Sequence, residues 1–354
     1  MKKNLLAIAA FALLLTSCET KLVEKVDLIP LAENVEIHKG AFPLSNLQSI
    51  QVPDEWKLTA DNFVKDLQKT ASLTVSLTDS EGSLVIVKDE SLSAEAYRLN
   101  IEKNRIKAGD IQGVNHGLAS LLQLIMTAKD AQLPVLTIQD KPAFGYRGLM
   151  LDCARHFWTV DELKETLDHM AFFKLNTLHM HLTDNQAWRL SMDKYPDLVK
   201  EGTYYYDFPE LSGKYYSKED LKEIVTYAGT RGIEIIPEVD LPGHSIALLA
   251  ALPELSCRGG KFEATPEERD WNKRKRGNEN MICIGNPQSF AFAEDVIDAL
   301  IEIFPSQYIH FGGDEVPTDI WEECPKCMAL YKREGMKSPG EIQDYFTRKM
   351  SDSF

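Results

Sequence analysis

The chain has 354 residues, 44% of them hydrophobic and 26% charged, which is typical of an ordinary globular protein and excludes a disordered or collagenous one. At roughly 150 residues per domain, this length allows two or three domains. The net charge of −15 makes nucleic acid an unfavourable partner, because an acidic surface repels a phosphate backbone. A neutral substrate fits this charge better.

Residues 1–17 show the pattern of a secretory signal, in which two lysines precede an apolar run over residues 5–15. That run is too short for a membrane span of about twenty residues. Its end resembles a bacterial lipobox, in which Cys18 is lipidated and becomes the first residue of the mature chain. Glu19 is not the aspartate associated with inner-membrane retention. We therefore expect an exported lipoprotein anchored in the outer membrane through lipid on Cys18; an ordinary cleaved signal is the alternative.

Export permits disulfides among the remaining cysteines. Cys257 and Cys283 bracket a polar, unpatterned stretch typical of a long loop, so we expect them to form a disulfide. Cys324 and Cys327 have the CxxC spacing of redox and zinc sites, but the sequence shows no second cysteine pair or nearby histidine pair to complete a tetrahedral set. We therefore expect a local disulfide or a free pair there, and no metal site.

Residues 18–140 are predicted to form a small α/β domain that ends near the Asp140-Lys141-Pro142 stretch. Short apolar runs indicate strands, and longer amphipathic patterns indicate helices. The expected strands lie at 83–88, 97–101 and 105–108, and the expected helices near 57–70 and 113–129.

From residue 145 to residue 354, apolar strands alternate with polar loops and amphipathic helices. Repeated strand–helix units predict an α/β fold with a parallel sheet. The expected strands are 146–151, 175–182, 233–239 and 308–311, and the helices lie near 160–173, 217–231, 288–304 and 340–351. Function in such folds is found in the loops at the carboxyl ends of the strands.

All four predicted strands end in clusters of polar residues, which parallel strands would bring together in one site. The clusters are 152–156, 181–184, 238–244 and 310–315. Asp314 and Glu315 are adjacent carboxylates after two glycines, and like charges this close tend to keep one group protonated as an acid. That suits glycoside hydrolysis, although the usual mechanisms need two carboxyl groups roughly 5 Å or more apart.

Four motifs resemble, in order and spacing, the β-N-acetylhexosaminidases of glycoside hydrolase family 20. They are Arg147–Asp152 with Arg155-His156-Phe157, His181–Arg189, Pro237–His244 and His310–Glu315. The resemblance implies a small α/β domain followed by a (β/α)₈ TIM barrel. It also implies exo-acting, retaining hydrolysis of glycans that end in N-acetylglucosamine or N-acetylgalactosamine, without a metal or other cofactor. The acetamido oxygen of the substrate is the nucleophile, so neighbouring protein carboxylates suffice.

The resemblance assigns roles to individual residues. Glu315 would be the general acid and then the base, and Asp314 would accept a hydrogen bond from the acetamido N–H. Arg147 would bind sugar hydroxyls. Three further residues would line the site, namely Asp184, Asp240 and His244, and three would support it from behind, namely His181, Glu238 and His310.

A complete barrel has eight strands in about 250 residues, whereas four are predicted between 145 and 354. We therefore expect only about the first four β/α units, with little activity of this chain by itself. Two alternatives stay open. One is a non-catalytic glycan-binding or inactive lipoprotein. The other is a metal-dependent barrel hydrolase, because His179 and His181 share one face of a strand.

Overall fold

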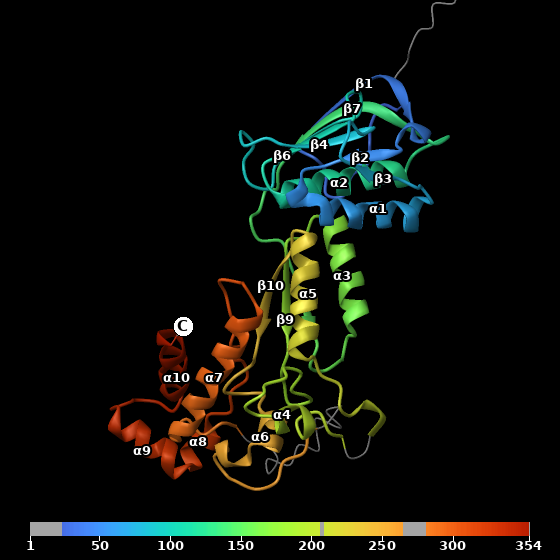
Figure 1. The fold of residues 1–354 in the computed structure, drawn as a ribbon. Helices are drawn as coiled ribbons and strands as arrows, with labels where there is room; N and C mark the ends of the chain where they lie inside the picture. Colours follow the sequence, from blue (N-terminus) through green and yellow to red (C-terminus); the bar gives the residue numbers. More distant parts are fainter. Residues whose placement is uncertain (1–22, 206–208, 265–280, 354) are drawn as a thin grey trace, which may run out of the picture.

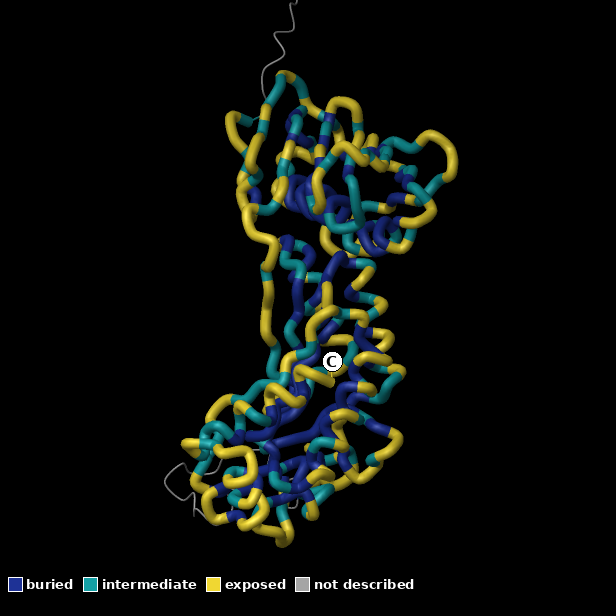
Figure 2. The backbone as a smooth tube through the Cα atoms, turned by 90° about the vertical axis from the view of Figure 1, so that its left-hand side faces the viewer, coloured by how far each residue is buried: buried dark blue, intermediate teal, exposed yellow. Residues whose placement is uncertain are grey.

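The computed structural model describes residues 23–205, 209–264 and 281–353. The predicted signal peptide and the lipidation site Cys18 lie outside the described residues. Within the described ranges, no helix combines the length and the apolar character needed to cross a membrane. The described chain forms two lobes, each built around its own hydrophobic core, as the buried backbone in Figure 2 shows.

The small lobe is a seven-stranded mixed sheet with strand order β1-β7-β5-β6-β4-β2-β3. Its strands are β1 Asn34–Pro43, β2 Ser49–Gln51, β3 Ser76–Thr78, β4 Leu84–Lys88, β5 Tyr97–Asn100, β6 Arg105–Ala108 and β7 Gln132–Asp140. Two helices, α1 Lys57–Ala71 and α2 Ile111–Met126, lie between this sheet and the second lobe (Figure 1). The predicted strands and helices of this region therefore all have counterparts in the structure.

The second lobe contains a parallel sheet with strand order β10-β9-β8. Its strands are β8 Gly148–Asp152, β9 Thr177–His181 and β10 Glu234–Glu238. The segment expected as a fourth strand at 308–311 runs beside β10 but forms only an isolated parallel bridge between Glu238 and His310. Three backbone hydrogen bonds of 3.0 Å hold it there, from His310 N–H to the Pro237 carbonyl, from Val239 N–H to the His310 carbonyl and from Leu241 N–H to the Phe311 carbonyl.

The helices of the second lobe follow the strands as predicted. The long ones are α3 Val160–Phe172, α5 Lys218–Thr230, α7 Pro287–Ile303 and α10 Glu341–Asp352; the short ones are α4 Asp197–Lys200, α6 Ile246–Ala251, α8 Asp319–Glu323 and α9 Pro325–Arg333. Capping boxes begin α3 and α5, formed by Thr159 with Glu162 and by Ser217 with Asp220. In Figure 1, α5 lies alongside β10 and α3 packs on the other side of α5, so the caps set where this helix pair starts relative to the sheet.

Buried charges join the small lobe to the amino-terminal ends of the parallel strands. Arg231, at the end of α5, forms ion pairs of 2.6 Å with Asp66 in the small lobe and 2.5 Å with Asp168. Lys174, just before β9, lies 3.0 Å from Asp140 at the end of β7. The carboxyl ends of the strands therefore point away from the small lobe (Figure 1).

The predicted disulfide between Cys257 and Cys283 is absent, because all five cysteines in the described ranges are free. The expectation that no second pair completes the CxxC set is also wrong. Ser256 and Ile282 form an antiparallel bridge that sets Cys257 and Cys283 beside each other, and both meet Cys324 and Cys327 at the start of α9. Tertiary contacts between distant segments, which sequence spacing does not reveal, bring these four side chains together.

Candidate active site

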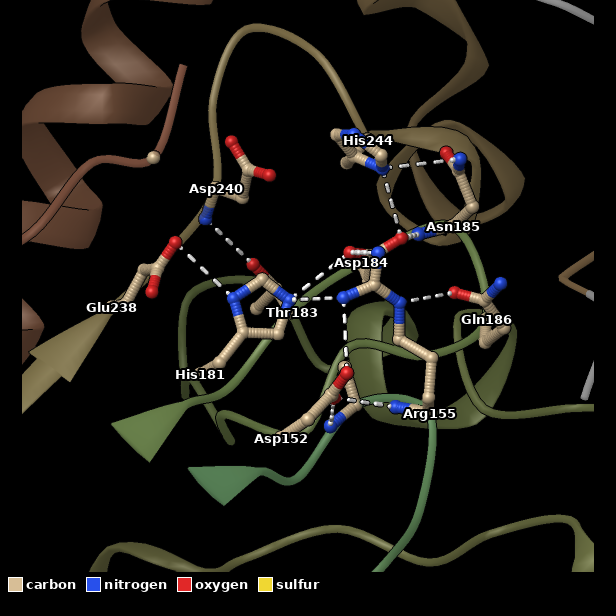
Figure 3. A network of polar contacts seen from close by, with 12 residues as sticks. Asp152, Arg155, His181, Thr183, Asp184, Asn185, Gln186, Glu238, Asp240 and His244 are labelled. Carbon is tan, nitrogen blue, oxygen red and sulfur yellow. Dashed lines mark hydrogen bonds and ion pairs between the residues drawn. The ribbon is translucent and has the colours of Figure 1, made fainter. Parts of the chain in front are cut away.

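The polar side chains that follow β8, β9 and β10 meet at the carboxyl ends of these strands (Figure 3). Asp184 is at the centre and is 1% exposed. One of its oxygens lies 2.6 Å from Arg155 Nη2 and 3.0 Å from His181 Nε2, and the other lies 3.1 Å from His244 Nδ1. Burial opposes ionisation, but the hydrogen bonds of His181 and His244 lower the pKa of Asp184 to about 2. Asp184 is therefore a fixed anion that orients its three partners.

Glu238, the last residue of β10, is a second buried anion. Its carboxylate lies 2.5 Å from His179 Nε2, 3.2 Å from His181 Nδ1 and 3.4 Å from His310 Nδ1. Although burial disfavours the charged form of His181, Asp184 and Glu238 raise its pKa to about 10. His181 is therefore an imidazolium that links the two carboxylates, in the supporting position predicted from the sequence.

Asp240 connects β10 to the loop that carries the two predicted catalytic carboxylates. Its backbone N–H donates to Thr183 Oγ1 at 3.0 Å, and its carboxylate accepts a 2.8 Å hydrogen bond from Gly313 N–H. Burial raises the pKa of Asp240 to about 7; the Gly313 N–H opposes this increase, and the charge of Asp314 adds to it. Asp240 is thus a carboxyl group that can hold a proton near neutral pH.

Asp314 and Glu315 lie at the open side of this network, with side chains 64% and 69% exposed. His244 Nε2 lies 3.6 Å from Asp314 Oδ2 and 3.5 Å from Glu315 Oε2, while its other ring nitrogen faces Asp184. The hydrogen bond with Asp184 raises the pKa of His244, and burial acts against this increase. The structure therefore brings the two adjacent carboxylates to one nitrogen of a histidine that is held from behind.

The backbone of the Asp314–Glu315 loop adopts left-handed conformations. Gly312 and Gly313 have φ of +56° and +99°, and Glu315 has φ of +49°. A Cβ atom on Gly312 would lie 2.0 Å from Asp240 Oδ1, so only glycine allows this approach. Gln343 of α10 also donates to the Gly313 carbonyl at 2.5 Å. Strained residues of this kind often occur at functional sites.

Arg147 does not lie at this site, which corrects the prediction that it binds sugar hydroxyls. It precedes β8 and therefore lies at the opposite end of the strand, where its guanidinium donates to the carbonyls of Lys174 and Phe144 at 2.7 Å and 2.6 Å and pairs with Glu95 of the small lobe. Its donors therefore join the two lobes.

Arg155 occupies the place expected for Arg147. It follows β8, is 42% exposed, and contacts Asp152 at 3.0 Å, Asp184 at 2.6 Å and Gln186 at 3.1 Å (Figure 3). In the sequence, Arg155 follows the strand predicted at 146–151, whereas Arg147 lies at the start of that strand. This difference could have distinguished the two arginines.

The fold and the site define a mixed α/β protein whose carboxylates and histidines gather at the carboxyl ends of parallel strands. The chain belongs to glycosyl hydrolase family 20. The model of the catalytic domain of this family matches residues 144–354, and the model of its domain 2 matches residues 25–141. The resemblance seen in the sequence motifs is thereby confirmed.

Named relatives and solved structures agree with this assignment. The chain is 34% identical to a β-hexosaminidase of Porphyromonas gingivalis over 92% of this chain and 43% of the relative, and 38% identical to one of Akkermansia muciniphila over 80% and 56%. An exo-β-N-acetylglucosaminidase of Vibrio harveyi, solved with N-acetylglucosamine, superposes with a TM-score of 0.80 at 31% identity, covering 92% of this chain and 52% of that one. The chain thus spans about half the length of the relatives it matches.

Proposed function

We propose that the protein is an exo-acting β-N-acetylhexosaminidase that releases terminal β-linked N-acetylglucosamine or N-acetylgalactosamine from glycans. The observation that carries the proposal is the placement of Asp314 and Glu315. In this chain, which belongs to family 20, both carboxylates are exposed and lie at the carboxyl ends of the strands. Each lies within 3.6 Å of His244 Nε2. Relatives at 34% and 38% identity carry the name β-hexosaminidase.

In this proposal, Glu315 protonates the leaving oxygen and later activates water, while Asp314 orients the acetamido N–H of the substrate. Because the acetamido oxygen attacks the anomeric carbon, the protein needs no second carboxylate about 5 Å away as a nucleophile. Arg155 supplies a partly exposed fork of donors for sugar hydroxyls, and Asp184 holds that fork at 2.6 Å. The reaction proceeds with retention and uses no metal or other cofactor.

The test compares two leaving groups. We expect Glu315→Gln to lower kcat/KM about 100- to 10,000-fold on an N-acetylglucosaminide with an alkyl or sugar leaving group, and much less on a nitrophenyl substrate that needs little protonation. Glu322→Gln, which removes an exposed carboxylate of α8, is the matched control and should leave both rates unchanged. Equal losses on both substrates would remove Glu315 from the acid role.

A second arm of the test concerns the nucleophile. Asp314→Asn should slow the hydrolysis of substrates that carry the acetamido group, and it should weaken the binding of a thiazoline that mimics the cyclised intermediate. An active wild-type protein that does not bind the thiazoline would overturn the substrate-assisted mechanism while leaving glycoside hydrolysis itself intact.

We further propose that β8, β9, β10 and the segment that reaches His310 are part of a (β/α)₈ barrel. The 0.80 TM-score to a family 20 structure supports this arrangement. In the described chain β8 is an edge strand, and its residues Leu149 and Met150 are 38% and 56% exposed. In a closed barrel the β8 amides that face away from β9 would be slow to exchange hydrogen, and rapid exchange there would argue against closure.

We propose, finally, that the protein is exported and anchored in a bacterial outer membrane through lipid on Cys18, as the lipobox-like sequence suggests. Fractionation of cells that express the wild type and Cys18→Ala tests this. We expect the wild type in the membrane fraction, with a lipid-modified amino terminus by mass spectrometry. A Cys18→Ala variant that remains in the membrane fraction to the same extent would contradict lipid anchoring.

A further inference from the structure

Four cysteines from three separate segments of the second lobe meet. Their Sγ atoms all lie within 4.8 Å of one another, and the residues are Cys257, Cys283, Cys324 and Cys327. Cys283 Sγ lies 3.6 Å from Cys324 Sγ and 3.7 Å from Cys327 Sγ, and Cys257 Sγ lies 3.8 Å from Cys327 Sγ. All four thiols are free, and three of the residues are buried. We call this group the cysteine cluster.

The spacing of the cysteine cluster matches a known coordination geometry. Zinc binds thiolate sulfur at about 2.3 Å with tetrahedral geometry, which places neighbouring sulfurs about 3.8 Å apart. The printed separations of 3.6, 3.7 and 3.8 Å are close to this value. One ion at the centre of the cysteine cluster could therefore bind all four sulfurs with little movement of the backbone.

The backbone around the cluster is also shaped for thiolates. Gly285 N–H points at Cys327 Sγ with a separation of 3.4 Å, as a donor to a charged sulfur would. A Cβ atom on Gly285 would lie 2.2 Å from the carbonyl carbon of Lys326 and 2.5 Å from the nitrogen of Cys327, so only glycine allows the two segments to approach. Cys327 itself lies in the first turn of α9, at the positive end of the helix dipole.

We propose that the cysteine cluster is a structural zinc site. Four protein ligands complete the tetrahedron and leave no open position for water or substrate, which distinguishes a structural site from a catalytic one. The ion would be Zn²⁺ bound by four thiolates, with the four thiol protons released to solvent. This site is separate from the carboxylate network, because none of its ligands belongs to that network.

The position of the cysteine cluster indicates which parts of the chain the ion would connect. Cys257 follows α6, which comes after His244; Cys283 precedes α7; Cys324 joins α8 to α9, which come after Glu315. A single ion would therefore tie together the loops that carry the two sides of the candidate active site. Trp321 of α8 is fully buried and donates from Nε1 to the Ile282 carbonyl at 3.2 Å, which strengthens the same junction.

The experiment measures metal in the purified full chain, expressed with its own export signal and also in the cytoplasm. We expect about one zinc per chain after dialysis in both preparations, and thiols of the cluster that react only after a strong chelator or denaturant is added. Cobalt(II) added to the metal-free protein should give the visible and near-ultraviolet bands of tetrahedral thiolate coordination. This spectrum is a readout that does not depend on any variant folding.

Variants separate a metal site from a merely well-packed cluster. Cys324→Ser should lose bound zinc. Gly285→Ala should lower zinc affinity about 10- to 100-fold, because the added Cβ clashes with the backbone of Lys326 and Cys327 and pushes the Gly285 N–H away from Cys327 Sγ. Cys153→Ser is the matched control, since Cys153 is buried in the same lobe but lies outside the cluster. It should bind zinc as the wild type does.

Two results would overturn the proposal. One is an exported protein whose intact mass shows two disulfides among these cysteines and no metal, since an oxidising compartment permits that chemistry. The other is a metal-free protein whose four thiols react freely and which gives no cobalt spectrum. Neither result would bear on glycoside hydrolysis, so the two proposals fail independently.

Discussion

Replacing Asp240 by asparagine should change how stability depends on pH. Burial raises the pKa of this carboxyl group to about 7 in the folded protein, from 3.8 for an ordinary aspartate. Asparagine has nearly the same shape and keeps an oxygen that can accept the 2.8 Å hydrogen bond from Gly313 N–H. The variant therefore removes the titration of Asp240 while leaving most of its packing intact.

The sign follows from proton binding. Between pH 4 and 7 the folded protein holds a proton on Asp240 that the unfolded chain has released, so the free energy of unfolding falls as the pH rises through this range. The contribution is favourable below the unfolded pKa of 3.8 and lost above the folded value of about 7. The difference between the folded and unfolded pKa values corresponds to about 4 kcal/mol of unfolding free energy in total. About 3 kcal/mol of this is lost between pH 5 and 8.

Urea denaturation of the wild type and Asp240→Asn at pH 5 and pH 8 measures this effect. We expect the free energy of unfolding of the variant, measured relative to the wild type, to be about 3 kcal/mol more favourable to the folded state at pH 8 than at pH 5. Asp89→Asn is the control: hydrogen bonds from Ser91 and Lys107 lower the pKa of Asp89 below the ordinary 3.8, so its contribution is lost only below that pH. Its difference from the wild type should stay constant from pH 5 to 8. Parallel curves for Asp240→Asn and the wild type would refute the reasoning.

Three further variants test the site and the junction between the lobes. Arg155→Lys should lower kcat/KM on N-acetylglucosaminides about 100-fold or more, whereas Arg147→Lys should change it by no more than about twofold; similar losses in both would contradict the reassignment. Gly312→Ala should destabilise the protein by about 1–3 kcal/mol in urea, because its Cβ would lie 2.0 Å from Asp240 Oδ1, and an unchanged midpoint would show that the loop relaxes. Arg231→Met should cost about 2–4 kcal/mol, because it leaves partly buried carboxylates of both lobes without their cation, and a cost below about 1 kcal/mol would mean that the pairs resemble surface ones.

Much of the second lobe could be predicted because parallel strands obey a simple rule. Hydrophobic runs located β8, β9 and β10, and the polar residues after them had to meet at one edge of the sheet. The same rule, applied strictly, selects Arg155 over Arg147, since only Arg155 follows its strand. Motif similarity alone could not separate two arginines in one motif. The two arginines are distinguished by the end of β8 at which each one lies.

The cysteine cluster could not be predicted from spacing in the same way. Its ligands come from three segments, and only the CxxC pair is local in sequence. The pairing of Ser256 with Ile282 and the start of α9 determine that Cys257 and Cys283 face that pair. These contacts depend on tertiary packing. A pairwise interpretation of the cysteines as disulfides therefore missed an arrangement in which all four act together.

The charges of the site support the proposal that its outermost carboxylates are the reactive ones. Asp184 and Glu238 are buried anions, and His181 lies between them as a cation, with hydrogen bonds to both. A buried charge with several partners is costly to disturb, so this alternating series fixes the geometry but has no free capacity to bind a ligand. Asp314 and Glu315 differ from these residues, because their side chains are mostly exposed. Both approach the network at His244, and Asp314 also interacts with Asp240. A substrate can therefore recruit these two groups without breaking the buried network that holds them in position.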